Sequence, residues 1–263
     1  MRTNQPTSTI QSRLSTLGIL FVSSIFGIIA INAQAKVTET ISKTIALKST
    51  GSIYLENING DVEITTCQCD QVSLDAHINA SDDSHKERVN IDIQADTNTL
   101  KIKTQYQKNQ HHHSGYVEVN YQLKVPQNVN LADIELVNGN LAIKGVKGKL
   151  FADMVNGNLI ANDLGNTTQV KMVNGNIKIY VADTSKIQSI QLNSVNGDID
   201  LYLPKTSGML LKASTVSGSL DNDFDIEIIK NRYIGEKMRG TTGDASMAVN
   251  LENVNGHISV HQN

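Results

Sequence analysis

The chain has 263 residues and a formal net charge of −3, with no tryptophan and only 4% aromatic residues. Because the chain has no basic excess, we expect neither nucleic acid nor anionic lipid to be its main partner. The scarcity of large aromatic side chains argues against the wide core of a compact β-sandwich. It favours a thin core built from Val, Ile, Leu and Ala.

Residues 1–35 have the pattern of a secretory signal peptide. Arg2 and Arg13 provide positive charge, an apolar stretch runs from Leu17 to Ile31, and Ala33-Gln34-Ala35 supplies a small-x-small cleavage site. An uncleaved membrane anchor is the alternative, but the apolar stretch is shorter than the about 20 residues that span a bilayer. We therefore expect an exported protein of the periplasm or cell surface, with no stable membrane insertion after cleavage.

The segment 36–126 is predicted to form an irregular β-rich cap together with a first coil of the fold described below. A short helix is expected near Asp82–Val89, and Pro126 with Asn128 should mark a turn. A cap is expected because the open end of a stack of strands exposes unpaired backbone groups. Alternating apolar residues predict three strands in this segment: Val72–Ile78, Leu100–Ile102 and Val117–Val125.

The segment 127–263 contains a tandem repeat. The string V-N-G-N occurs three times, followed by the variants VNGD, VSGS and VNGH, and an early copy, INGD, lies at Ile58–Asp61. The last spacing between glycines, 38 residues, is about two repeat lengths and suggests one degenerate coil in between. The glycines follow one another at spacings of 18, 18, 22, 21 and 38 residues: Gly139, Gly157, Gly175, Gly197, Gly218 and Gly256.

Apolar residues alternate with polar ones on both sides of each glycine, which predicts strands with one buried face. Asn-Gly between such strands is also a strong hairpin signal, so a meander of hairpins is the rival interpretation. Stacked coils explain better why the same residues recur every 18 to 22 positions, since equivalent side chains then form columns. We predict an all-β fold, a single-stranded β-helix or solenoid, that forms one continuous domain with 36–126.

In such a coil the glycines should adopt a left-handed backbone conformation, which a Cβ atom disfavours. The side-chain amide of each preceding asparagine should bond the asparagine of the next coil. We expect this ladder to have a structural role rather than to bind a ligand. It comprises Asn138, Asn156, Asn174, Asn196 and Asn255.

The sequence contains two cysteines, Cys67 and Cys69. In an oxidising compartment a pair normally forms a disulfide, although residues two apart on a strand lie near the distance limit for one. A local bridge at a turn, two free thiols, and a redox or metal-binding CxC site are the three interpretations.

Two further clusters could bind metal ions. His111 and His113 of the His-His-His run could share one face of an extended loop and hold Zn, Cu or Ni, although a solvated loop tip is the simpler interpretation. The run from Asp221 to Glu227 begins like a calcium loop, but Ile226 stands where that motif needs Gly. A solvated acidic strand face is expected there, and we expect no metal or cofactor.

From Tyr116 to Pro204 the sequence resembles the bacterial putative-adhesin β-solenoid family, whose biochemical role is undefined. The resemblance rests on the lead-in at Val117–Pro126, on the tandem VNGN copies, and on GDIDLYLP at Gly197–Pro204. The segment Thr241–Val260 is also similar to that family's ending, so the resemblance covers nearly all of 50–263. It implies an exported, non-enzymatic β-helix-like domain, called adhesin-like by analogy, and it supplies no catalytic residues.

The sequence has no nucleophile elbow, zinc-protease, Walker or dinucleotide-binding motif. We therefore expect a structural or interaction protein of the cell envelope whose partner is an envelope protein or polymer. Two alternatives come from other classes. One is a carbohydrate-active enzyme on a degenerate β-helix, recognisable by two carboxylates about 5–10 Å apart in a groove. The other is a metal-binding envelope protein that uses the His loop.

Overall fold

The computed structural model describes Met1 and residues 36–107, 115–230 and 234–263. The expected signal peptide and the loop with His111 and His113 therefore lie outside the described residues. In the described ranges, no helix combines the length and apolarity needed to cross a bilayer.

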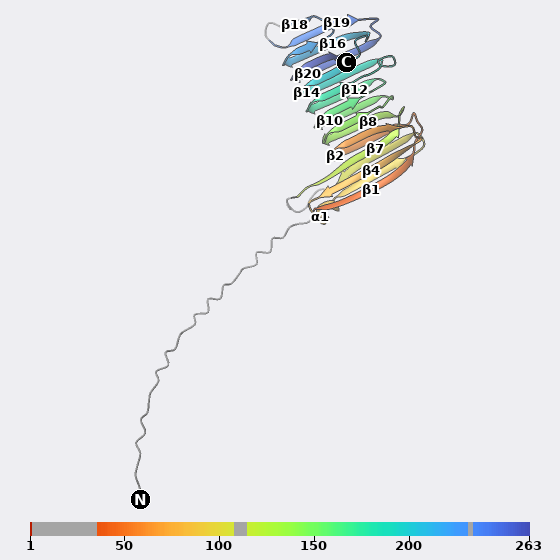
Figure 1. Cartoon of the computed structure of the whole chain (residues 1–263), viewed down its shortest axis with the longest axis vertical. Helices are drawn as coiled ribbons and strands as arrows, with labels where there is room; N and C mark the ends of the chain where they lie inside the picture. The colour runs from red at the N-terminus through yellow and green to blue at the C-terminus, as the bar shows by residue number, and fades with distance from the viewer. Residues whose placement is uncertain (2–35, 108–114, 231–233) are drawn as a thin grey trace. The chain divides into compact units, whose positions relative to one another are not determined.

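Residues 36–263 form two large β-sheets whose strands stack along one axis (Figure 1). Sheet A contains, in spatial order, β1 (Val37–Ala46), β4 (Gln71–Ala80), β7 (Val117–Pro126), β3 (Val62–Cys67), β9 (Leu141–Lys144), β11 (Leu159–Asn162), β13 (Ile177–Tyr180), β15 (Ile199–Leu203), β21 (Ile258–Gln262) and β17 (Leu220–Asn222). Sheet B contains β18 (Ile228–Lys230), β19 (Glu236–Thr242), β16 (Met209–Ser217), β20 (Met247–Asn255), β14 (Ser189–Asn196), β12 (Thr168–Asn174), β10 (Leu150–Asn156), β8 (Asn130–Asn138), β2 (Ser52–Asn59), β6 (Thr99–Tyr106) and β5 (Val89–Ala95).

Each repeat is one coil of the solenoid. A strand of sheet B ends at the Asn of the motif, the glycine turns the chain, and the next strand belongs to sheet A. Neighbouring coils pair in parallel and in register, so that Asn156 lies beside both Asn138 and Asn174. The predicted β-solenoid is confirmed. The hairpin alternative is wrong because each Asn-Gly connects two different sheets rather than two antiparallel strands of one sheet.

The core is a thin layer between the two sheets. The alternating residues of β10 and β11, such as Ala152, Met154, Leu159 and Ala161, are at most 2% exposed. Because every coil contributes the same positions, the aliphatic side chains stack into columns that bury each other along the axis. This arrangement explains why the chain needs few aromatic residues.

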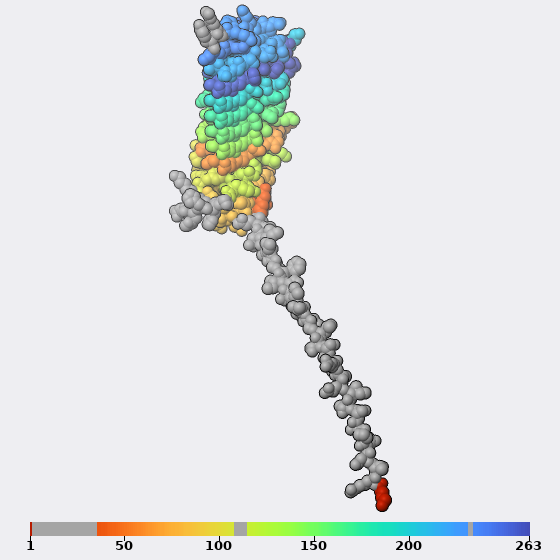
Figure 2. Space-filling view, turned by 90° about the vertical axis from the view of Figure 1, so that its left-hand side faces the viewer, coloured from red at the N-terminus to blue at the C-terminus, as the bar shows by residue number. Residues whose placement is uncertain are grey.

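The order of the coils in space differs from their order in the sequence. The last coil, β20 and β21, lies between the β14/β15 coil and the β16/β17 coil, as the dark blue band within Figure 2 shows. The prediction of one degenerate coil between Gly218 and Gly256 is therefore wrong. That interval instead contains β18 and β19, of which β19 pairs antiparallel with β16 and β18 pairs antiparallel with β19. At the other end, the β2/β3 coil likewise lies between β6/β7 and β8/β9.

Antiparallel strands end both sheets at the N-terminal end of the stack and sheet B at the other end, where sheet A ends on β17, which pairs in parallel with β21. At the N-terminal end, β1 pairs with β4, β4 with β7, and β5 with β6, all antiparallel. The expected short helix is α1 (Asp83–Lys86). Asp82 caps it, because its Oδ1 accepts hydrogen bonds from the backbone N–H of His85 at 2.9 Å and from Nδ1 of His85 at 2.7 Å. A hydrogen bond from the hydroxyl of Ser84, together with these bonds from His85, holds the pKa of Asp82 well below its usual value.

The turn glycines are required for two physical reasons. The φ angle of Gly157 is +139°, a positive value that side chains with a Cβ rarely adopt. A Cβ on Gly157 would also lie 2.0 Å from the carbonyl oxygen of Gly139 in the neighbouring coil. The φ angle of Gly157 lies in the left-handed region, and its turn passes directly over the turn below it.

Candidate functional site

The residue two positions before each motif glycine faces solvent although it is apolar. Alternation buries the residues three and five positions before the glycine, so the residues two and four before it must point outward. These seven side chains, which we call the valine column, are 38% to 51% exposed. In their order along the stack they are Ile58, Val137, Val155, Val173, Val195, Val254 and Val216.

The valine column is one continuous apolar stripe. Parallel strands lie about 4.8 Å apart, so six steps between seven side chains give a stripe about 29 Å long. Isolated exposed apolar residues are common on protein surfaces, but a contiguous stripe bordered by polar residues typically marks an interaction surface. The column is therefore the strongest candidate for a binding site in the described part of the chain.

A groove of about 780 Å³ runs along the outer face of sheet B from Val137 to Val216. The valine column forms one side of this valine groove. The other side is formed by the residues four positions before each glycine, which we call the rim row. Pairing of the strands places its members side by side in the order Glu56, Glu135, Asp153, Lys171, Asn193, Glu252 and Ser214.

The rim row carries a net negative charge. Burial raises the pKa of Glu135, and the nearby carboxylates of Asp133, Glu56 and Asp153 raise it further. Burial likewise raises the pKa of Asp133, with added repulsion from Asp153 and Glu56. Nζ of Lys171 lies 3.6 Å from Oδ2 of Asp153 and balances part of this charge. A cationic partner would relieve the remaining repulsion.

The asparagine ladder borders the valine column. Nδ2 of Asn156 donates to Oδ1 of Asn138 at 2.8 Å, and Nδ2 of Asn174 donates to Oδ1 of Asn156 at 2.8 Å. Asn196 and Asn255 continue the series at 2.8 and 2.9 Å, and Asn138 extends it to Asn59 at 3.0 Å. The structure thus brings together all the asparagines named from the sequence, in a column of amides that bond one another.

A second ladder follows each glycine. The backbone N–H of Asn158 donates to Oδ1 of Asn140 at 3.0 Å, and that of Asn176 donates to Oδ1 of Asn158 at 3.0 Å. Asp198 and His257 repeat the pattern. The two ladders fix the turn on both sides, which holds the valine column at a constant position from coil to coil.

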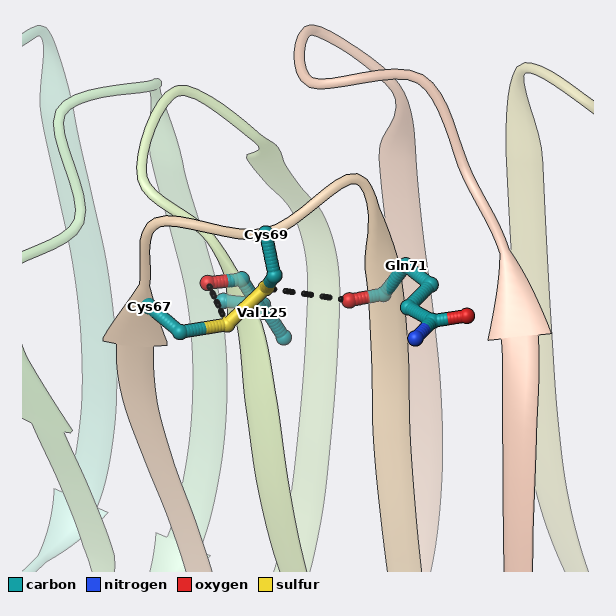
Figure 3. The surroundings of a disulfide bond; sticks show 4 residues. All are labelled: Cys67, Cys69, Gln71 and Val125. Carbon is teal, nitrogen blue, oxygen red and sulfur yellow. Dashed lines mark hydrogen bonds between the residues drawn. A yellow bond between two sulfur atoms is a disulfide. The ribbon is translucent and has the colours of Figure 1, made fainter.

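Cys67 and Cys69 form a disulfide with a Cα–Cα distance of 5.3 Å. The bridge spans the turn between β3 and β4, as Figure 3 shows. Sγ of Cys67 lies 3.6 Å from the carbonyl oxygen of Val125, and Sγ of Cys69 lies 3.2 Å from that of Gln71. The cysteines are on sheet A and its connections, so they do not contribute to the valine groove on sheet B.

The acidic run from Asp221 to Glu227 is not the strand face expected from its alternation. Only its first two residues belong to β17, and Oδ1 of Asn222 accepts hydrogen bonds from the backbone N–H groups of Phe224 and Ile226. These bonds turn the chain away from the sheet. Among the residues that the structure describes, no group of three or more His, Cys, Asp or Glu side chains is placed to hold a metal ion.

Neither the valine column nor the groove was predicted from the sequence. The signal was present, because Val recurs two positions before the glycine and out of phase with the buried residues on either side of it. If Val is assigned to the core because it is apolar, its outward position in the alternation is missed. Burial must be assigned from position in the alternation, and only then does the exposed column become apparent.

No curated protein sequence matches the chain. Among solved structures, one described as a putative cell adhesion protein from Clostridium sporogenes is 14% identical, with a TM-score of 0.52, over 86% of this chain and all of that chain. One described as a putative adhesin from Bacteroides fragilis is 12% identical, with a TM-score of 0.38, over 86% of this chain and 97% of that chain. The first of these similarities supports the fold.

The Toastrack DUF4097 family matches residues 49–261. The match covers the stacked coils from the β2/β3 coil to β21, and with them the whole valine column. The chain therefore belongs to the Toastrack DUF4097 family.

Proposed function

We propose that the protein is an exported, non-enzymatic, adhesin-like interaction protein of the cell envelope that binds its partner along the valine groove. The observation that carries this proposal is the valine column, seven β-branched side chains exposed in register beside a groove. Exposing apolar side chains to water in every coil brings no stability to the fold, whereas burying them against a partner is favourable.

The arrangement of carboxylates supports binding rather than glycoside hydrolysis. Glu135 and Asp153 lie beside each other on adjacent strands, so both belong to the same side of the groove. A glycosidase needs its two carboxyl groups on either side of the bond that is cleaved. Lys171 belongs to the same row, and its Nζ lies 3.6 Å from Oδ2 of Asp153.

Export is supported by the signal-peptide pattern of residues 1–35. The test is to fractionate the native cell and determine the N-terminus of the protein. We expect a chain that begins at Lys36, in the periplasmic or surface fraction. An intact Met1 in the cytoplasmic fraction would contradict export while leaving the binding proposal in place.

Binding along the groove is tested by placing a photo-crosslinking residue at Val155 in the native cell. The matched control is Ile160, an apolar residue of the same coil that is 46% exposed on sheet A. We expect a discrete crosslinked product from position 155 and none from position 160. Equal crosslinking at both positions would show that the valine column has no special role.

A further inference from the structure

The valine groove also indicates what kind of partner it accepts, an inference that rests on the proposed function. We propose that the groove binds a basic amphipathic α-helix of another protein, with the helix axis along the stack of coils. The apolar side of this helix would cover the valine column, and its basic side chains would face the rim row.

The spacing of the column suits a helix. Six members of the valine column, from Val137 to Val216, line the groove. The five intervals between them, of about 4.8 Å each, give about 24 Å, which is the length of a helix of about 16 residues. Helix side chains three and four positions apart are separated by about 4.5 and 6 Å along the axis, so successive ones fall near successive valines. In a partner bound as an extended strand, the side chains on one face would recur about every 6.8 Å. They would therefore fall out of register with the valines within two coils.

The charge of the groove selects a basic helix. The rim row within the groove has three carboxylates, those of Glu135, Asp153 and Glu252, against one cation, Lys171. Glu135 and Asp133 are also held close to other carboxylates on neighbouring strands. Lysine or arginine at the flank of a bound helix would pair with these groups, and an acidic helix would be repelled by them.

A second copy of the chain fits the groove less well. The exposed parts of seven aliphatic side chains amount to on the order of a few hundred Å², whereas a stable dimer buries about 800 Å² on each partner. Two copies face to face would also bring two acidic rim rows together. An acyl chain fits poorly too, because the groove is open and would leave one side of the chain in water.

The test uses three synthetic peptides of about 18 residues, labelled for fluorescence anisotropy. The first is a helix with leucine along one face and lysine on the other. The second has glutamate in place of lysine, and the third has the composition of the first in a scrambled order without an apolar face. We expect the first peptide to bind the purified protein at least about tenfold more tightly than either of the others.

The matched variants are Val155→Thr with Val173→Thr, which keeps the β-branched shape, and Ile160→Thr on the opposite sheet as control. The groove variant should bind the Leu/Lys peptide at least about tenfold more weakly, and the control should bind it like the wild type. The variant Glu135→Gln with Asp153→Asn should weaken binding and reduce its dependence on salt. Unchanged thermal unfolding of each variant confirms that the fold is intact.

Equal binding of the lysine and glutamate peptides, or an equal effect of Ile160→Thr, would overturn the proposal. If no peptide binds while crosslinking at Val155 captures a partner in the cell, the proposal of a helical partner is wrong. The proposal that the groove binds a partner is then retained. If light scattering shows a dimer that Val155→Thr with Val173→Thr dissociates, the occupant is a second copy and this proposal fails.

Discussion

The side-chain amide of Asn255 donates to Oδ1 of Asn196 at 2.9 Å, although 59 residues separate the two in the chain. Ser217, which follows Asn196 much sooner in the sequence, pairs with Asn255 from the other side. The last coil is therefore inserted between two coils that precede it in the chain. It completes the pairing of β14 and β16, which would otherwise each have a free edge at this point.

This insertion predicts that the C-terminal coil stabilises strands far from it in sequence. Leu251 is fully buried in β20 between Leu192 and Ala213. Leu251→Ala should lower the free energy of unfolding by about 2–5 kcal/mol. Hydrogen exchange should show that β14 and β16 lose protection together with β20. Loss of protection in β20 alone would show that the insertion does not couple these coils.

The turn glycines should tolerate no side chain. A Cβ at Gly157 meets the carbonyl oxygen of Gly139 and requires a positive φ angle, so Gly157→Ala should cost at least about 2–3 kcal/mol of stability. Chemical denaturation measures this loss. The neighbouring change Asn156→Ala removes two exposed ladder hydrogen bonds but introduces no clash, so it should cost only about 0.5–1.5 kcal/mol. Equal losses for the two variants would contradict the close stacking of the turns.

Burial of a tyrosine hydroxyl between the sheets should make the protein sensitive to alkali. The hydroxyl of Tyr121 in β7 lies 2.7 Å from Oγ1 of Thr104 in β6, and burial raises the pKa of Tyr121 to about 12. The unfolded chain releases this proton near pH 10. Stability from this group is therefore complete below pH 10 and falls as the pH rises from about 10 to 12.

The variant Tyr121→Phe tests this pH dependence. At pH 8 its free energy of unfolding should be about 1–3 kcal/mol lower than that of the wild type, because Thr104 loses its hydrogen-bond partner. Its stability should then decline less steeply between pH 10 and 12. Some decline remains, since burial also raises the pKa of Tyr106 to about 12. Parallel pH profiles for the two proteins would show that Tyr121 does not carry the effect.

The disulfide should contribute little to the stability of the stack. The bridge between Cys67 and Cys69 closes a loop of three residues. It therefore removes little entropy from the unfolded chain and stabilises the folded protein by only about 1–2 kcal/mol. The double variant Cys67→Ser with Cys69→Ser should remain folded, with a modest decrease in the denaturation midpoint. Reduction of the wild type should have the same effect, and unfolding on reduction would contradict this prediction.

The repeat made most of the fold predictable. Alternation on both sides of Gly157 indicated strands with one buried face, and identical turns at equal spacing indicated stacked coils. The same alternation also placed Val155 on the outer face, so the valine column could have been derived by phase alone. The loop from Asn222 could not be derived in this way, because its acidic residues alternate as a strand would and its side-chain hydrogen bonds replace the sheet.

The sequence by itself determined the coil: where its strands lie, which side chains are buried, and why glycine must occupy its turn. These follow from interactions within about 20 residues and from steric limits on the backbone. Only the tertiary structure decided the order of the coils, and with it which side chains lie next to one another along the groove. All coils present the same columns of Val, Asn and Gly, so β14 could pair equally well with β16 or β20 by local pattern. The choice depends on the path of the chain through β18 and β19, which involves contacts between distant residues.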